Sequence, residues 1–265
     1  MCNADAGPFV YRNVKRLFAI VFALAALGAR AQEIETTTIV VPIVGNIAGI
    51  GVRWVTSVEL RNTTGTPVEV WMLLPTTAEA QAFNRTLAPN ETVTMSDVIA
   101  QAFGTTTALS PLKVITTGRR SVTVRANVYP VRGDGQVLAA EPITVDYGPS
   151  FYPIRYLPGL AFSDDFRTNI GLANLSEDKD ATFILALQRL PGRNVAVSRI
   201  TLPPESLSHT PIQSLFPLIT SGGDFTIVVE TASPDTFVYA SVIDNNTTAA
   251  RFIHANVGLP VDVTQ

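Results

Sequence analysis

The feature that most constrains this chain is a nine-residue pattern that occurs twice, 112 residues apart. Trp54–Asn62 reads WVTSVELRN and Phe166–Asn174 reads FRTNIGLAN, so an aromatic residue, Thr, a β-branched residue, Leu and Asn share the same offsets. Apolar and polar residues alternate with a period of two, which predicts a half-buried β-strand in each place. The residues of the other face differ between the copies, so any functional difference is expected on the faces and loops where the copies disagree.

The segments that follow each strand also repeat in the same order. Further matched pairs keep offsets of 113–115 residues: Val68–Leu74 with Ala181–Leu187, Leu87–Asn90 with Leu202–Glu205, Phe103 with Phe216, Leu112–Thr116 with Phe225–Val229, and Arg125–Val128 with Tyr239–Val242. We therefore predict a tandem duplication, with domain 1 over residues 38–148 and domain 2 over residues 149–260. The boundary is placed at Asp146–Pro153, where prolines, a glycine and aromatic residues predict a short, stiff linker.

Composition agrees with β-structure, because the chain is 46% hydrophobic and only 15% charged, against about 25% charged in an average domain. Each unit contains seven or eight short strand candidates separated by turn signals, a pattern typical of immunoglobulin-like sandwiches. We therefore predict an all-β protein of two tandem Ig-like antiparallel β-sandwich domains, each with one short helix. The first helix is expected over residues 98–103, between an N-cap at Ser96-Asp97 and a stop at Gly104.

Several individual segments carry specific expectations. Thr38–Val44 is a strand candidate in which Pro42 indicates a sheet edge, and residues 47–52 are expected to form a loop. In Val68–Leu74 the even-numbered residues should face inward, with Glu69 and Trp71 outward. Gly133–Gly135 predicts a hairpin turn leading into a strand over residues 137–140.

The N-terminus predicts a signal peptide over residues 1–31, with cleavage after Ala31. A basic segment precedes an apolar run, Leu17–Gly28, which is followed by a small-x-small site. The run is shorter than the roughly 20 residues of a membrane span, so we expect no integral span in the mature chain. Residues 1–13 are interpreted as a mis-assigned start before Val14. The only cysteine is Cys2, so we expect a disulfide-free bacterial protein that is exported to the periplasm or the cell exterior.

No local pattern predicts an active site. His209 and His254 are the only histidines, and neither has partners at a metal-ligand spacing such as H-E-x-x-H. There is no G-x-S-x-G motif, and Gly45-x-x-x-Gly49-x-Gly51 lacks the lysine of a phosphate loop, so we interpret it as a flexible loop. We therefore predict that the chain is not an enzyme and has no catalytic, cofactor-binding or metal-binding residues. A Ser-His-Asp triad assembled from distant residues stays open.

Candidate binding residues are few, and each has a plain structural alternative. Asp164-Asp165 and Glu177–Asp180 flank the second copy of the repeated strand, where they suit either calcium or solvated turns. Arg119-Arg120 and the outward Trp71 are candidate ligand contacts. The net charge is −3 and no basic block follows the N-terminal segment, which argues against a nucleic-acid partner.

The order of repeated strand, second alternating strand, Leu-x-Pro turn and short helix ending in Phe resembles uncharacterised secreted bacterial proteins built from tandem Ig-like β-sandwich repeats. The resemblance spans roughly residues 40–258 and implies fold and export, without catalytic residues. We expect a non-catalytic structural or binding protein of the periplasm or cell surface, whose partner is another surface protein or a glycan. The alternatives are a carbohydrate-binding accessory module, a two-domain periplasmic pilus-type chaperone with Arg155 near its cleft, and an enzyme with a dispersed site.

Overall fold

The computed structural model describes residues 35–75, 81–145, 152–190, 193–219 and 221–256. The regular secondary structure of the described residues is almost entirely β-strand, with two short helices. The N-terminal half contains β1 (Thr36–Ala48), β2 (Val52–Asn62), β3 (Val68–Leu74), β4 (Gln81–Leu87), β5 (Thr92–Met95), α2 (Val98–Phe103), β6 (Ala108–Thr117), β7 (Val122–Arg132) and β8 (Glu141–Ile143). The C-terminal half contains β9 (Ile154–Phe162), β10 (Phe166–Asn174), β11 (Ala181–Leu190), β12 (Arg193–Leu202), β13 (Ser206–Pro211), α3 (Ile212–Leu215), β14 (Gly222–Thr231), β15 (Thr236–Asp244) and β16 (Ala250–His254).

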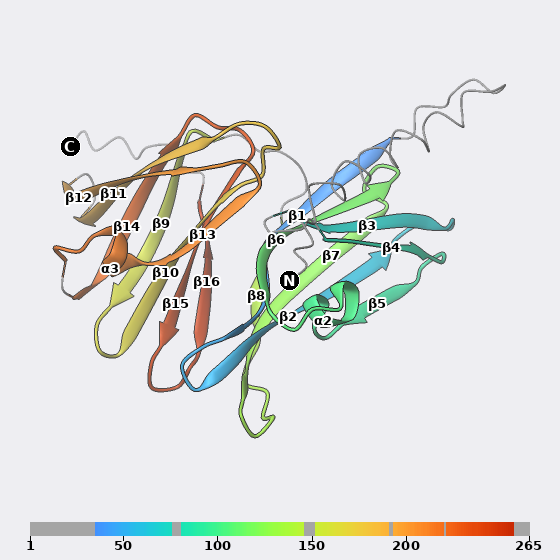
Figure 1. The fold of residues 1–265 in the computed structure, drawn as a ribbon, viewed down its shortest axis with the longest axis horizontal. Coiled ribbons are helices and arrows are strands. Elements are labelled where there is room, and N and C mark those ends of the chain that lie inside the picture. The colour runs from blue at the N-terminus through green and yellow to red at the C-terminus, as the bar shows by residue number, and fades with distance from the viewer. Residues whose placement is uncertain (1–34, 76–80, 146–151, 191–192, 220, 257–265) are drawn as a thin grey trace, which may run out of the picture.

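The strands pair in the same way in both halves (Figure 1). In the C-terminal half, two antiparallel sheets have the orders β12-β11-β14-β9 and β13-β10-β15-β16. The N-terminal half has the equivalent layers β4-β3-β6-β1 and β5-β2-β7-β8. These two layers join into one sheet because the end of β1 also pairs with β2, through Asn46–Ala48. The prediction of an all-β antiparallel sandwich with short helices is therefore confirmed.

The strand order differs from that of an immunoglobulin domain, notably in the places of the first and the seventh strands. There the first strand lies beside the second, and the last lies beside the sixth. Here the first strand of the C-terminal half, β9, lies beside β14, whereas β15 lies beside β10. The first and the seventh strands have thus exchanged sheets relative to the immunoglobulin order, although each half keeps the predicted two-layer antiparallel architecture.

Each half buries its own hydrophobic core between its two layers. One core is formed by residues between Ile39 and Ile143, and the other by residues between Leu157 and Ala255. The repeated strands supply equivalent positions, because Leu60 of β2 and Leu172 of β10 are both fully buried. The alternation predicted for β3 is confirmed as well: its even-numbered residues are buried, Glu69 is exposed and Trp71 is half-buried.

One predicted strand boundary is wrong, and one predicted strand is absent from the described residues. β1 continues to Ala48, past the loop expected from residue 47, because Gly45 and Asn46 still pair with β6 and the strand then meets β2. Its register shifts beside Pro42, between Val41 and Val44. The strand predicted over residues 137–140 is absent from the described chain: Val137 forms only an isolated bridge and is 59% exposed. Since no layer covers these residues, regular pairing resumes only at β8.

Some predictions fall outside the described residues. These are the signal peptide over residues 1–31, its cleavage after Ala31, the position of Cys2 and most of the predicted linker. Of the linker aromatics, Tyr152 is described, and it is exposed. No helix in the described part of the chain is long and apolar enough to cross a membrane.

Candidate functional site

In the described part of the chain, the contacts between the two halves include a small apolar cluster and two hydrogen bonds. The cluster contains Val40 from β1 together with Ala173, Leu175, Leu207 and Phe237 from the C-terminal half. Beside it, Lys113 Nζ donates to the carbonyl oxygen of Leu175 at 3.1 Å. Farther along, the backbone N–H of Phe252 donates to Glu141 Oε1, also at 3.1 Å. These contacts hold the outer face of the β13-β10-β15-β16 sheet against the N-terminal half.

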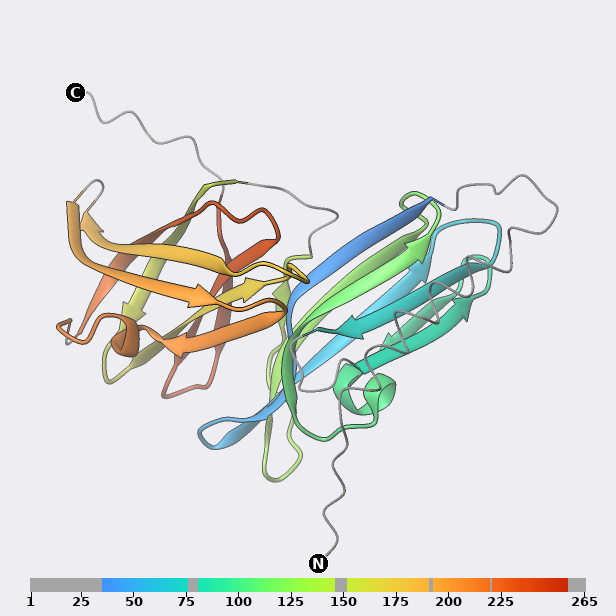
Figure 2. The same ribbon diagram turned by 45° about the horizontal axis from the view of Figure 1, so that its top comes forward.

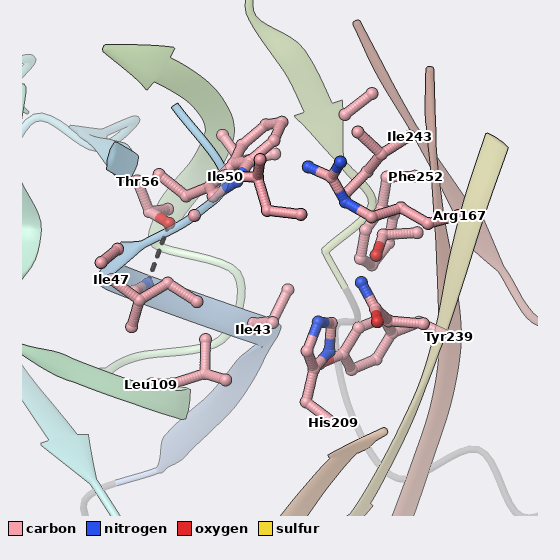
Figure 3. A pocket seen from close by; sticks show the side chains of 18 residues that line it. Ile43, Ile47, Ile50, Thr56, Leu109, Arg167, His209, Tyr239, Ile243 and Phe252 are labelled. Atoms are coloured by element: carbon pink, nitrogen blue, oxygen red, sulfur yellow. Dashed lines mark hydrogen bonds between the residues drawn. The ribbon is translucent and has the colours of Figure 1, made fainter. Parts of the chain in front are cut away.

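A cavity of about 230 Å³ lies between the halves, next to this contact (Figure 3). Its N-terminal wall is mostly apolar and comes from β1, the turn into β2, the first half of β2, the start of β6 and the middle of β7. That wall includes Ile43, Ile47, Ile50, Trp54 and Leu109. The opposite wall is the outer face of the β13-β10-β15-β16 sheet, and it holds the polar lining side chains Arg167, Asn169, His209, Tyr239 and Ser241.

A polar network fixes the hairpin that forms the apolar wall. Arg53 donates through Nε to Asn46 Oδ1 and through Nη2 to the carbonyl oxygen of Thr106. Asn46 Nδ2 in turn donates to Asp97 Oδ2 at 2.5 Å. Asp97 is the N-cap of α2, as predicted, and its other oxygen accepts from the N–H of Ala100. The hairpin, which projects beyond its sheet in Figure 2, is therefore tied to the start of the helix.

Of the three glycines predicted to form a flexible loop, Gly45 and Gly49 are closely packed instead, whereas Gly51 is exposed in the turn and a Cβ atom on it would meet no atom within 4 Å. Gly45 lies within β1, and its N–H donates to Thr56 Oγ1 at 2.9 Å (Figure 3). A Cβ atom on Gly49 would lie 2.4 Å from Trp54 Nε1, so the indole rests directly on the turn. Because they lack a side chain, Gly45 can pack against Leu109 and Gly49 against the Trp54 indole, and the indole lines the cavity.

The polar wall is organised around Tyr239, whose side chain is fully buried. Its ring lies over Gly171 of β10, where a Cβ atom would be only 1.9 Å from Tyr239 Cζ. His209 and Phe252 stack beside the ring, with centroid separations of 5.8 and 5.2 Å. Glycine at position 171 is therefore what allows an aromatic row to cross the outer face of this sheet.

His209 is a buried, neutral imidazole. Its Nδ1 forms a hydrogen bond with the Tyr239 hydroxyl, at 3.0 Å. Burial lowers the pKa of His209 to about 4 and raises the pKa of Tyr239 well above its usual value. Both groups therefore remain uncharged at neutral pH, which suits a cavity with a mostly apolar lining.

Acidification should destabilise the protein through His209. Since the folded-state pKa is about 4 and the ordinary value is 6.5, the unfolded chain binds a proton first as the pH falls below 6.5. The free energy of unfolding therefore decreases, by roughly 2 kcal/mol between pH 7 and pH 5 from this residue. Urea unfolding at both pH values measures the loss, which should be smaller in His209→Gln. An equal loss in the variant would assign the pH dependence to other groups.

Arg167 of β10 brings a cationic group to the cavity. Figure 3 shows its guanidinium pointing across the cavity toward Ile50. Arg167 Nη1 donates to Asn245 Oδ1 at 2.7 Å. Partial burial lowers the pKa of Arg167 from its ordinary value, but an arginine remains protonated in proteins. The side chain thus places a positive charge beside a mostly apolar surface.

The other predicted candidates lie away from the cavity lining. His254 packs edge-on against Phe237, with 6.4 Å between the ring centroids. Arg155 is buried in the C-terminal half, where its Nη1 donates to the carbonyl oxygen of Thr236 at 2.8 Å. Trp71 is half-buried on β3, and Arg119-Arg120 form the turn between β6 and β7.

The acidic candidates do not come together. Asp164-Asp165 precede β10 and Glu177–Asp180 follow it, so the two groups lie at opposite ends of a nine-residue strand, roughly 25 Å apart. Asp165 Oδ1 accepts from Asn246 Nδ2, and Asp178 Oδ1 accepts from Ser176 Oγ. In the described ranges, no three His, Cys, Asp or Glu side chains gather as a metal ion would require.

No protein family, curated protein or solved structure matches this chain. The resemblance to secreted sandwich-repeat proteins therefore stays an expectation. Arg167 and Asn169 were missed as site residues, although a signal was present in the repeat. They occupy the places of Val55 and Ser57 in the first copy, so the outer face of the second copy differs where the cavity lies.

Proposed function

We propose that this protein is an exported, non-catalytic binding protein, built from two copies of one β-sandwich module, that holds a small molecule between them. The observation that carries the proposal is the cavity of about 230 Å³ with one apolar and one partly polar wall, each contributed by a different half. Ligand sites commonly lie between domains and combine apolar walls with a few polar groups. The predicted signal peptide supports export, and the repeated strand pairing supports duplication.

The chemistry around the cavity favours binding over catalysis. A histidine base needs a nucleophile or substrate within reach and a third group that orients it. In the described part of the chain, the hydrogen-bond partner of His209 is the buried hydroxyl of Tyr239. A low imidazole pKa and a phenol pKa above its usual value leave both groups poorly matched to proton transfer at neutral pH.

A small apolar ligand fits this cavity better than a glycan does. Sugar-binding modules present open aromatic faces, whereas Tyr239 is fully buried between His209 and Phe252. Trp71, the aromatic residue expected to contact a sugar, is half-buried on another sheet. Arg155, the residue expected near the cleft of a pilus-type chaperone, is buried within the C-terminal half and donates to the backbone carbonyl of Thr236.

Intrinsic fluorescence offers a direct test, since the chain has two tryptophans and Trp54 lines the cavity. In a Trp71→Phe background, 2-naphthol should quench Trp54 emission saturably. We expect a Kd of about 0.1 mM, from ~0.5 kcal/mol for each non-hydrogen atom.

Ala250→Phe, which places a ring in the cavity, should weaken this binding more than about tenfold, or 1.4 kcal/mol. The matched control is Ala82→Phe, at an exposed alanine outside the lining, which should bind as tightly as the parent. Saturable binding that survives Ala250→Phe would place the ligand elsewhere, and no saturable quenching would refute the proposal.

A further inference from the structure

We infer that the cavity selects small monocarboxylic acids with an apolar body, and that the carboxylate lies against Arg167. The inference rests on the proposed binding function and names its ligand class. Arg167 is the only formally charged side chain among the described residues that line the cavity, because His209 is neutral there. An anionic group is therefore the natural complement of this site.

The guanidinium retains donors for such a group. Arginine presents five N–H donors in a fork that matches a carboxylate, and Asn245, a neutral amide, accepts one of them. Among the described residues, no carboxylate forms an ion pair with Arg167. The neighbouring acids are engaged elsewhere: Asp165 bonds Asn246, and Asp244 Oδ1 accepts backbone N–H groups of the following turn. Because partly buried charges are usually paired, a bound anion would supply the missing partner.

Two neutral donors extend the same surface. Asn169 lies two residues after Arg167 on the same face of β10, and Ser241 is its neighbour on β15. Residues two apart along a strand are separated by roughly 7 Å at the backbone, a spacing that one carboxylate can bridge when each of its oxygens accepts a hydrogen bond. Neither Asn169 nor Ser241 has a side-chain hydrogen-bond partner within the described ranges. They can donate to the second carboxylate oxygen while Arg167 holds the first.

The opposite wall determines the rest of the ligand. Ile43, Ile47 and Leu109 offer aliphatic surface, and Trp54 adds an aromatic ring. At about 230 Å³ the cavity is smaller than the roughly 300 Å³ at which pockets for drug-sized ligands begin. Since the apolar wall has no group to pair with a second charge, a compact apolar body with a single acid group fits best.

Three probes that share one body test the inference by calorimetry: 3-phenylpropionate, 3-phenylpropionamide and 3-phenylpropylamine. The anion should bind roughly tenfold to a hundredfold more tightly than the amide, because hydrogen bonds to charged groups are the stronger ones. The amine should bind more weakly than the amide, because its charge repels the guanidinium. This comparison uses the unmodified protein, so it does not depend on how any variant folds.

Variants then assign the preference to Arg167. Arg167→Gln should bind the acid and the amide equally well, and Arg167→Lys should retain part of the preference. The matched control, Arg199→Gln, removes an exposed arginine of β12 outside the cavity and should leave the preference unchanged.

Two results would overturn the inference in distinguishable ways. Equal affinity for the acid and the amide, with both lost in Ala250→Phe, would remove the acid selectivity and leave the binding function intact. Failure of all three probes would also remove the selectivity, and if 2-naphthol failed as well, the binding function itself would fall.

Discussion

Asn174→Asp is expected to lower the free energy of unfolding by about 4 kcal/mol, the largest effect that we predict for an isosteric change. The side chain is fully buried, and its Nδ2 donates to three carbonyl oxygens, those of Lys179, Leu202 and Pro203, at 2.8–3.1 Å. Aspartate would replace this donor with an oxygen facing the same three carbonyls. Burying an unpaired charge and leaving acceptors without donors are among the costliest changes in a protein interior.

Asn62→Asp should produce a similar loss in the other half. Asn62 is also fully buried, and its Nδ2 donates to the carbonyl oxygens of Thr66, Leu87 and Ala88 at 2.7–3.2 Å. Asn62 Oδ1 accepts from the N–H of Thr64, two residues on, as Asn174 Oδ1 accepts from the N–H of Ser176. The repeated Asn therefore joins the end of one strand to the turn that precedes the β5 or β13 strand.

Urea unfolding followed by circular dichroism measures both losses. The control is Asn194→Asp, because Asn194 is exposed and its Oδ1 accepts a hydrogen bond from Gln188 that an aspartate can still accept. That change should stay within about 0.5 kcal/mol of the wild type. A fully buried aspartate is more easily accommodated when protonated, so the loss in Asn174→Asp should shrink as the pH is lowered. A variant as stable as the wild type at pH 7 would contradict this reading of the turn.

Asn174 illustrates which features can be predicted from the sequence alone and which cannot. Its recurrence at the end of both copies of the strand was visible, and turn chemistry was the reasonable interpretation. The carbonyls that it bonds belong partly to residues 28 and 29 positions later in the chain. Such partners depend on how distant strands meet, and no local pattern encodes that. The alternation of apolar and polar residues is a property of a single strand. It could therefore predict the inward face of β3, but it could not predict which distant carbonyls Asn174 bonds.

The cavity was beyond prediction because it depends on how the two halves pack. Arg167 and Asn169 could be recognised as departures from the first copy, but only the placement of the β1–β2 hairpin opposite them makes a site. The strand predicted over residues 137–140 failed because an apolar run requires a covering layer, and Val137 lacks one. The repeated sequence pattern therefore predicted the core residues that the two halves share. It could not predict the contacts between the halves, which occur once in the molecule.

Gly171→Ala is the second change with a large expected effect, a loss of about 3 kcal/mol in the free energy of unfolding. The added Cβ would lie 1.9 Å from Tyr239 Cζ and 2.0 Å from Cε1. Because the ring is fully buried between His209 and Phe252, it cannot move aside without disturbing its neighbours. Overpacking of this kind costs roughly 1–3 kcal/mol or more.

A double-mutant cycle separates the clash from a general effect of alanine on the strand. In a Tyr239→Val background the ring is gone, so Gly171→Ala should cost less than about 1 kcal/mol, which gives a coupling of roughly 2 kcal/mol. Gly223→Ala is the matched control, since no atom lies within 4 Å of its Cβ position, and it should be nearly neutral. If Gly171→Ala cost as much without the tyrosine ring as with it, contact with the ring would not be the cause.

Gly171→Ala should also weaken binding in the cavity, because Tyr239 belongs to the polar wall and a displaced ring would change the shape of that wall. The first half has Glu59 at the position of Gly171, and Arg125 at the position of Tyr239. There the two side chains are exposed or half-exposed and lie 3.7 Å apart as an ion pair. One outer face thus presents a charge pair to solvent, whereas its counterpart combines a glycine with a buried aromatic row. We therefore expect Gly171→Ala to lower both stability and 2-naphthol affinity, and Glu59→Ala to change each only slightly.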